Sequence, residues 1–583
     1  MSPKPTSPSH GNPVLPLRSR LGCKTCKIRR VKCGQEKPNC VRCSSTGRKC
    51  EYVKATAGTF SSASPPSTTA LDHPLSSAPN TVWRERRAFA YYFERVALFV
   101  GGDLDVDFWS SFVPQLCHGE PAVWDAIISI SALFETHDQP SNLVSIQLLN
   151  QSPVTHSQGD ALAWYSRSVS AMRQRIERGQ VDLFVGLMTC VLFICVETLQ
   201  GREKEALQLF SQGLQLIHAL RAQIASGMVP AARAILFEDA IVPIFIRLAV
   251  VSFNEAAPQL DNLLRTRAHI SSFDFTNLRY AREALTVLGA ETMLFERRCV
   301  EQLAQSNAVY VTQELFEQQA SFFQRLQAWD ITFKKLLDSL FARGPLSQQQ
   351  VINSALLIAH HKTTVILTTI CVSSLQSISD QCLEEFQAII DQCTLALNAS
   401  RRPDGTQPPF TFDIGVGVPL WVTSLRCREP RIRRAAVDLL RRAPPLMGFY
   451  RSTSAVSFAE HIMMLEEANA MALRRTRREN LVEAAAGGKS DKQGSYYDTP
   501  QLEMDGAVMA LAEIPEEARI GPINVVRQDE GSPTTMMEER VASCNSSREV
   551  TGMRFSRNQR DPANNTWTRV HEYLPLEPPR AER

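Results

Sequence analysis

The sequence predicts a small metal-binding module joined by a flexible linker to a large, mainly all-α domain, with a partly disordered tail at the carboxyl end. Three observations lead to this prediction. Six of the fifteen cysteines lie between residues 23 and 50. Residues 53–81 are rich in Ser, Thr, Ala and Pro without apolar periodicity, which is typical of a linker. Beyond residue 82, apolar residues return at helical spacing.

The distribution of charge separates the two ends of the chain. Of its 583 residues, 44% are hydrophobic and 21% are charged, so most of the chain can bury a core. The formal net charge is +3, but residues 1–55 hold 13 Lys and Arg against 2 Asp and Glu. A basic head on a mildly acidic body predicts an anionic partner at that end.

The first twenty residues and the apolar stretches indicate whether the chain is secreted, inserted in a membrane or intracellular. Residues 1–20 are Pro- and Ser-rich and lack the apolar core of a secretory signal, so we expect a disordered arm on an intracellular chain with reduced cysteines. The apolar run at residues 183–196 is too short to span a bilayer and is typical of a buried helix. We therefore expect no membrane partner.

The clustered cysteines form two copies of the same sequence spacing. Their spacing is C-x2-C-x6-C, six residues, then C-x2-C-x6-C again, made by Cys23, Cys26, Cys33, Cys40, Cys43 and Cys50. Two tetrahedral zinc ions need eight ligand positions, which six thiolates supply when two of them bridge both metals. The spacing predicts two Zn²⁺ per chain. An iron–sulfur cluster uses the same donors with tighter or less symmetric spacing, and a disulfide framework needs an oxidising compartment.

This segment resembles the DNA-binding module of the fungal binuclear zinc cluster transcription factors, over all six cysteines and the basic run between them. The resemblance implies that the first and fourth cysteines, Cys23 and Cys40, bridge the metals. The family also has a proline between the two halves, which Pro38 matches. The expectation is a binuclear zinc cluster DNA-binding domain over residues 21–52, acting in the nucleus on double-stranded DNA with CGG-type triplets.

Basic residues between and after the cysteines are the candidate DNA contacts. Residues 27–32 form a short cationic element that fits a major groove, where Arg or Lys donates to guanine. The resemblance implies that Arg30 touches the bases of the triplet, although lysine is commoner there in the family. The full candidate set is Lys24, Lys27, Arg29, Arg30, Lys32, Arg42, Arg48 and Lys49. Those other than Arg30 and Lys32 suit phosphate contacts, and a solvated basic face is the alternative for each alone.

Residues 82–482 are predicted to form the all-α domain. The first helix, over residues 84–100, has a predicted buried stripe of Phe89, Tyr92, Phe93, Val96 and Val100. The second, over residues 122–137, has a stripe of Val123, Ile127, Ile130 and Phe134. Further helices are expected near residues 157–178, 181–199, 203–226, 233–253, 321–341, 350–375, 381–398 and 430–442.

The body carries a second, weaker resemblance. Stretches such as RRAFAYYFERVALFVGGDLDVDFW and LRCREPRIRRAAVDLL resemble the helical regulatory domain found downstream of many fungal zinc clusters. The resemblance implies regulation and not catalysis. Basic runs at residues 431–442 and 474–478 suit either nuclear import or an ordinary helix surface.

Residues 483–583 are predicted to be an acidic, partly disordered tail. Within it, residues 496–517 hold six acids and no Lys or Arg, which fits an activation segment that folds on a coactivator or an ordinary acidic tail. Strand-like residues 550–556 and 566–574 predict a terminal β-hairpin.

Together these features predict a sequence-specific DNA-binding regulator of RNA polymerase II transcription in a fungus, of a kind that often governs a metabolic or secondary-metabolite gene set. The alternative is a zinc-stabilised protein-interaction scaffold, which would not need the basic run at residues 27–32. An enzyme is disfavoured because G-x-S-x-G, H-E-x-x-H and Walker motifs are missing, so no catalytic residue is assigned. Four prolines in residues 53–81 rule out a coiled coil there, so any homodimer would form through the helical body.

Overall fold

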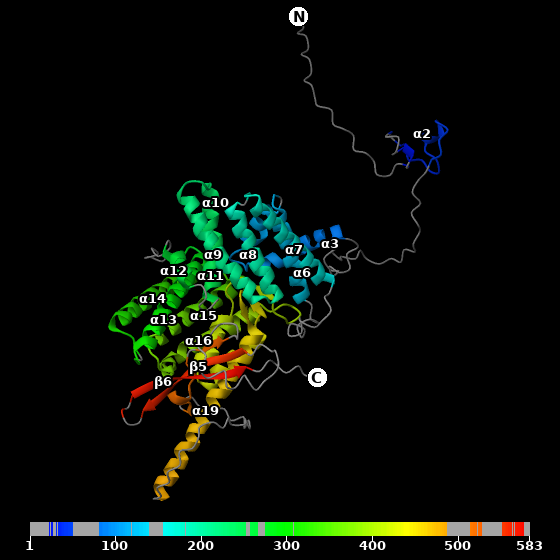
Figure 1. Ribbon diagram of the computed structural model, residues 1–583. Helices are drawn as coiled ribbons and strands as arrows, with labels where there is room; N and C mark the ends of the chain where they lie inside the picture. Colours follow the sequence, from blue (N-terminus) through cyan, green and yellow to red (C-terminus); the bar gives the residue numbers. More distant parts are fainter. Residues whose placement is uncertain are drawn as a thin grey trace. The chain divides into compact units, whose positions relative to one another are not determined.

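The structure is a computed structural model of the 583-residue chain. It describes residues 23, 25–26, 31, 33–50, 81–117, 119–138, 156–180, 182–251, 257–265, 274–306, 308–486, 513–521, 523–526, 551–561, 564 and 566–576. The chain divides into two compact units, Met1–Thr69 and Ala70–Arg583. The first holds the cysteine cluster and the short helix α2 (Val41–Ser44). The second is mainly helical, as predicted (Figure 1).

The helices of the second unit follow one another with short connections over most of its length. In chain order they are α3 (Thr81–Tyr91), α4 (Ala97–Val100), α5 (Val113–Leu116), α6 (Pro121–Asp138), α7 (His156–Glu177), α8 (Leu183–Gln200), α9 (Glu203–Ala225), α10 (Ala231–Leu236), α11 (Val242–Val251), α12 (Ala257–Arg265), α13 (Leu278–Ser306), α14 (Gln313–Ala342), α15 (Gln348–Ile370), α16 (Leu383–Ala399), α17 (Gly417–Arg426), α18 (Pro430–Arg442) and α19 (Ser452–Ala486). Three π-helical turns, η2 (Tyr92–Val96), η3 (Phe108–Phe112) and η6 (Phe237–Ile241), lie between helices of this series.

The stripe predicted for residues 84–100 is wrong at one position. Tyr92, Val96 and Val100 are fully buried, but Phe93 is 52% exposed. The π-helical turn η2 lies between α3 and α4, and its wider turn rotates the side chains that follow. Tyr91, which directly precedes Tyr92 and is not part of the predicted stripe, is buried as well.

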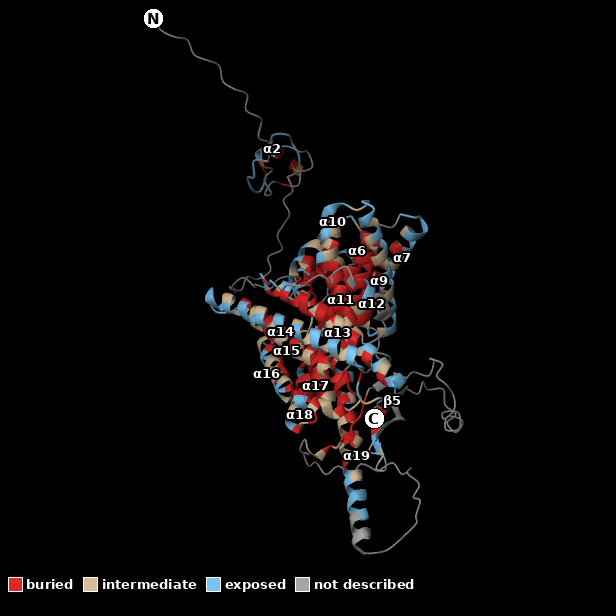
Figure 2. Ribbon diagram, turned by 90° about the vertical axis from the view of Figure 1, so that its left-hand side faces the viewer, coloured by how far each residue is buried: buried red, intermediate tan, exposed pale blue. Residues whose placement is uncertain are grey.

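Helix α6 lies at the centre of the amino-terminal half of the body. Its predicted stripe of Val123, Ile127, Ile130 and Phe134 is fully buried. Because α6 packs against α3, α7 and α8, nearly all of its other residues are buried as well. Figure 2 shows this interior as a buried zone around α6, α9 and α11, and residues of α8 belong to the same core.

Helix α8 is long and apolar enough to cross a membrane by length and composition alone, yet 83% of it is buried inside the protein. It packs against α6 and α9. Asp182 caps its start by accepting a hydrogen bond from the Phe184 amide at 2.9 Å, and Gly201 ends it with a left-handed φ of 80°. It is a core helix, as the sequence predicts.

The sequence does not predict helices α12, α13, α17 and α19, and α13 shows one reason. Arg282, on the buried face of α13, is fully buried and pairs with Asp105 (Nη2–Oδ1, 2.6 Å) and Asp413 (Nη1–Oδ2, 2.9 Å). Arg247 of α11 also pairs with Asp105. A charged residue at a core position interrupts the apolar periodicity that indicates a helix, while its buried partners make that position tolerable.

Two three-stranded sheets complete the described part of the body. Strands β1 (Phe410–Thr411), β2 (Leu446–Met447) and β3 (Tyr450–Arg451) form one three-stranded sheet, with β1 and β2 parallel. Strands β5 (Thr551–Asp561) and β6 (Thr566–Leu576) pair antiparallel where the sequence predicts a hairpin, and β4 (Ile523–Val526) adds a third strand beside β5. In this second sheet Thr551 pairs with Leu576 and Asp561 with Thr566.

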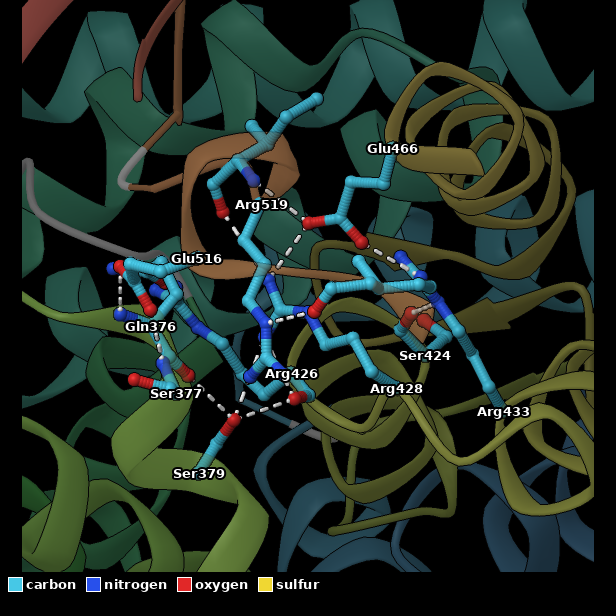
Figure 3. Close-up of polar contacts among 12 residues, drawn as sticks. Gln376, Ser377, Ser379, Ser424, Arg426, Arg428, Arg433, Glu466, Glu516 and Arg519 are labelled. Atoms are coloured by element: carbon cyan, nitrogen blue, oxygen red, sulfur yellow. Dashed lines mark hydrogen bonds and ion pairs between the residues drawn. The ribbon is translucent and has the colours of Figure 1, made fainter. Parts of the chain in front are cut away.

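Residues 513–521, which the sequence places in the tail, are packed into the body. The Glu516 carboxylate accepts hydrogen bonds from the backbone amides of Gln376 and Ser377, both at 2.7 Å, at the start of the 3-10 helix η7 (Gln376–Cys382) (Figure 3). Arg519 donates to both oxygens of Asp380 at 2.8 Å. The predicted boundary between body and tail, at residue 482, falls inside α19.

The same segment completes a buried ionic cluster. Glu466 of α19 accepts from Arg428 Nη2 at 2.8 Å and from Arg433 Nη1 of α18 at 2.7 Å (Figure 3). Its Oε1 also accepts from the Ile520 amide at 2.7 Å. The side chains of Arg428 and Glu466 are 0% exposed, so this polar cluster is enclosed by α18, α19 and residues 513–521.

Candidate metal centre and nucleic-acid interface

Four sulfur atoms of the first unit form a compact, fully buried cage. Those of Cys23, Cys26, Cys40 and Cys43 all lie within 4.8 Å of one another. The Cys23 sulfur is 3.8 Å from that of Cys40 and 3.7 Å from that of Cys43, and the Cys26 sulfur is 3.6 Å and 3.8 Å from the same two. A Zn–S bond of about 2.3 Å gives a tetrahedron with S–S edges of about 3.8 Å. The sulfurs therefore fit a thiolate-ligated metal.

The other two cysteines stand in equivalent places in the two halves. The Cys33 sulfur accepts a hydrogen bond from the Cys23 amide at 3.3 Å. The Cys50 sulfur accepts one from the Cys40 amide, also at 3.3 Å. The repeated spacing in the sequence thus becomes a repeated geometry, and both sulfurs pack against the buried four. Amide hydrogen bonds of this kind stabilise the negative charge on sulfur ligands.

The cage favours a bound cation. Burial and the neighbouring sulfurs raise the pKa of the Cys43 thiol to about 12 and also raise the pKa of Cys26. Although burial acts in the opposite direction, hydrogen bonds from Cys26 lower the pKa of Cys23. A bound divalent ion supplies the positive charge that holds sulfurs such as those of Cys26 and Cys43 as thiolates.

Two contacts that the sequence analysis did not identify hold this small unit together. Thr25 Oγ1 in the first half donates to the Lys49 carbonyl in the second at 2.8 Å. Glu36 Oε2 accepts from the Val41 amide at 3.1 Å, at the start of α2. The peptide bond between Lys37 and Pro38 is cis. Side-chain contacts of this kind have no periodic signature, so spacing alone does not reveal them.

The structure places three of the eight candidate DNA contacts. Arg42 on α2, and Arg48 and Lys49 after it, are exposed to solvent. The chain turns at this point, with the Arg48 amide donating to the Cys43 carbonyl at 3.0 Å. The remaining candidates, Lys24, Lys27, Arg29, Arg30 and Lys32, lie outside the described residues.

The adjacent histidines of the body serve packing. His360 Nε2 lies 2.8 Å from the Gly415 carbonyl oxygen, and His361 Nε2 lies 3.0 Å from that of Leu326. The His361 ring also stacks on Trp329, with centroids 5.0 Å apart. Burial lowers the pKa of both rings, so both are held neutral at physiological pH.

Comparison with known proteins finds two domains in the chain. Residues 21–58 match the sequence model of the fungal Zn(2)-Cys(6) binuclear cluster domain. Residues 87–241 match that of the fungal specific transcription factor domain, a range that covers helices α4 to α10. No solved structure matches the chain.

The curated relatives that match the chain are named as transcription regulators or transcription factors. The aspercryptin biosynthesis cluster-specific transcription regulator atnN of Emericella nidulans is 27% identical over 58% of this chain and 58% of its own length. The transcription regulator lscL of Purpureocillium lilacinum is 27% identical over 36% of this chain and 52% of its own. The Zn(2)-C6 fungal-type transcription factor afumD of Aspergillus fumigatus is 29% identical over 20% and 32%. The chain thus spans about half the length of the curated relatives it matches.

The relatives and both domain types are transcription regulators and not enzymes. Zinc binding follows from the six-cysteine domain and from the sulfur cage. The chain therefore contains a fungal Zn(2)-Cys(6) binuclear cluster domain at residues 21–58, followed by a fungal specific transcription factor domain at residues 87–241.

Proposed function

We propose that this protein is a nuclear, sequence-specific DNA-binding regulator of RNA polymerase II transcription that reads CGG-type triplets. The observation that carries the proposal is the symmetric cage of cysteine sulfurs with exposed basic side chains beside it. A small metal-stabilised unit with a cationic surface suits the negatively charged backbone and the base edges of a major groove. The names of the relatives support the same function.

The proposed division of labour follows the chemistry of the basic residues. Arg30 lies in the cationic run between Cys26 and Cys33 and would donate to guanine O6 and N7. Arg42, Arg48 and Lys49 are exposed and would contact phosphates, as would Lys24, Lys27 and Arg29. Phosphate contacts fix the position of the unit on DNA, and the base contact supplies the sequence preference.

Substitution of Arg30 separates base reading from general attraction to DNA. Arg30→Ala is expected to weaken binding to a CGG-containing duplex by about 1–3 kcal/mol and to relax the preference for guanine. Lys49→Ala should weaken binding to all duplexes alike and lower the salt dependence. Fluorescence anisotropy with specific and scrambled duplexes over a range of salt measures both effects. An equal loss on both duplexes for Arg30→Ala would show that Arg30 does not read bases and would favour the scaffold alternative.

We propose two zinc ions per chain, bridged by Cys23 and Cys40. Six cysteines complete two tetrahedra only by sharing two sulfurs, and the Cys23 and Cys40 sulfurs lie 3.8 Å apart, one from each half of the repeat. Elemental analysis of the desalted protein should therefore give two zinc atoms per chain and no iron. One zinc atom per chain, or iron in its place, would contradict the binuclear cluster.

The gene set is proposed from the relatives' names. The regulator from Emericella nidulans is named for the aspercryptin biosynthesis cluster, and the Claviceps purpurea relative, 40% identical over 45 residues, for the ergochrome gene cluster. We infer that this protein likewise controls a metabolic or secondary-metabolite gene set. Mapping the genomic sites that the tagged protein occupies should give peaks that contain CGG triplets near such genes.

Partners other than DNA belong to the second unit. Residues 496–512 of the acidic segment lie outside the described residues, while residues 513–517 at its end are packed into the body. We propose that a coactivator contacts the acidic segment. We further propose that any homodimer forms through the helical body, because residues 53–81 offer no heptad pattern.

The oligomeric state of a short fragment tests this assignment of the dimer. The fragment 1–81 contains the cluster and the Pro-rich linker and is expected to sediment as a monomer, alone and on a one-triplet duplex. The full chain, measured under the same conditions, is the comparison. A stable dimer of the fragment without DNA would show that the linker region itself associates.

A further inference from the structure

The described residues of the second unit surround a cavity where α13, η7, α17 and strand β6 meet. Its empty volume is about 520 Å³, including the part open to solvent. Polar groups line it from four directions: Glu296 of α13, Gln376 of η7, Arg426 of α17 and Arg569 of β6. Leu303 and Ile378 contribute an apolar wall. One cavity thus joins two guanidinium groups, a carboxyl group and an apolar surface.

The two arginines differ from the other arginines of this region in having no ionic partner among the described residues. Arg519 pairs with Asp380, and Arg428 and Arg433 pair with Glu466. Arg426 donates to the neutral side-chain oxygen of Gln376 at 2.6 Å (Figure 3). Arg569 lines the same cavity without a carboxylate partner in the described part of the chain. Burial lowers the pKa of both guanidinium groups.

Glu296 is the acidic group in the lining of this cavity. Its side chain makes no hydrogen bond or ion pair with the described residues, although it lines the same cavity as Arg426. Burial raises the pKa of Glu296, and the attraction of Arg426 opposes that shift. The two guanidinium groups can each donate several hydrogen bonds to one anion in the cavity.

We propose that this cavity binds a small organic carboxylate. The anionic head would lie between Arg426 and Arg569, because a guanidinium matches the geometry of a carboxylate. The apolar part of the ligand would lie against Leu303 and Ile378, which an inorganic anion would leave uncovered. The proposal goes beyond transcription control and does not depend on it. A ligand held by α13, α17 and β6 would also stabilise the packed carboxyl-terminal sheet, because it binds the folded arrangement and not the unfolded chain.

The test uses the full chain with benzoate as the probe, since benzoate combines one carboxylate with one apolar ring. Benzyl alcohol and benzylamine are the neutral and cationic probes of similar size, and inorganic phosphate is the anion without an apolar part. At a concentration about ten times its Kd, benzoate is expected to raise the melting temperature by about 1–2 °C. Benzyl alcohol, benzylamine and phosphate are expected to have at most a small effect. An equal or larger rise with any of the three would overturn the proposal.

Variants connect the response to the cavity. Arg569→Gln and, independently, Arg426→Gln are expected to reduce the affinity for benzoate at least tenfold in isothermal titration. Arg560→Gln is the matched control, because Arg560 is an exposed arginine on the neighbouring strand β5 and does not line the cavity. Circular dichroism establishes that each variant is folded. If both cavity variants fold and bind benzoate as tightly as the Arg560→Gln protein, the carboxylate site is wrong. DNA binding, measured separately, does not enter this result.

Discussion

Replacing either Cys23 or Cys40 with serine is expected to unfold the zinc module and to abolish both zinc binding and DNA binding. Each of these sulfurs is proposed to bind both metals, so one substitution removes a ligand from two tetrahedra. Zinc binding supplies about 10–16 kcal/mol of folding free energy in small zinc domains, and a module of this size has little other core. Zinc content and anisotropy on a CGG duplex, measured on the full chain, should both fall to background.

Two further substitutions define what that result means. Cys33→Ser removes a ligand expected to serve one metal, so partial zinc content should remain in that variant. Ser44→Ala changes an exposed residue of α2 and should leave both zinc content and DNA binding intact. If the Cys23→Ser and Cys40→Ser proteins kept as much zinc as the Cys33→Ser protein, neither sulfur would be a bridge.

Glu466→Gln is expected to destabilise the helical body by about 3–5 kcal/mol, the usual cost of removing one partner from a buried ion pair. The substitution leaves the buried guanidinium groups of Arg428 and Arg433 without a negative charge. It also weakens the acceptor for the Ile520 amide, which helps to hold residues 513–521 in place. Urea unfolding of the full chain, followed by the helical circular dichroism signal, measures the change.

The neighbouring residue provides a matched control. Glu467 lies on the same helix and also pairs with an arginine, Arg434, but the Arg434 and Glu467 side chains are 32% and 18% exposed. Exposed ion pairs contribute about 0–1 kcal/mol, so Glu467→Gln should change stability little. Similar losses of stability for the two variants would show that the contribution of the Glu466 cluster to the free energy of unfolding does not depend on its burial.

The same cluster predicts how the stability of the body depends on pH. Although burial acts in the opposite direction, Arg428 and Arg433 hold the pKa of Glu466 at about 2. A lowered pKa means that the stabilisation is fully present above the ordinary glutamate pKa of about 4.3 and is lost as the pH falls from there toward 2. The stability difference between the natural chain and Glu466→Gln should therefore stay constant near neutral pH and narrow below about pH 4. A difference that grew on acidification would contradict this assignment.

The sequence predicts those parts of the structure that depend on a repeated pattern. The spacing of Cys23 to Cys50 indicates a metal cage, and the structure brings four of these sulfurs within 4.8 Å of one another. The apolar spacing of α6 predicts its buried stripe because neighbouring helices cover that stripe. In both cases the distance along the chain fixes the distance in space.

Features that depend on pairing between distant residues could not be predicted in this way. Arg282 is a core residue of α13 because Asp105 and Asp413, far away in the sequence, neutralise it. Phe93 is exposed because a π-helical turn changes the helix register, and the apolar pattern carries no sign of that turn. Glu516 belongs to the body because its carboxylate accepts hydrogen bonds from the Gln376 and Ser377 amides at the start of η7. A composition typical of an acidic tail is equally compatible with a segment that packs into the body.

The packing of residues 513–521 into the body also bears on genetics. A premature stop codon after α19 would yield a protein that still contains the zinc cluster and most of the helices. Such a product would keep Arg428, Arg433 and Glu466 but lose Ile520, Arg519 and Glu516, exposing a charged cluster that is enclosed in the intact chain. Cells remove proteins with lowered stability through proteolysis and chaperone triage. Late nonsense alleles of this gene should accordingly lower the abundance of the protein, so a loss of function in a truncation strain would not locate an activation segment.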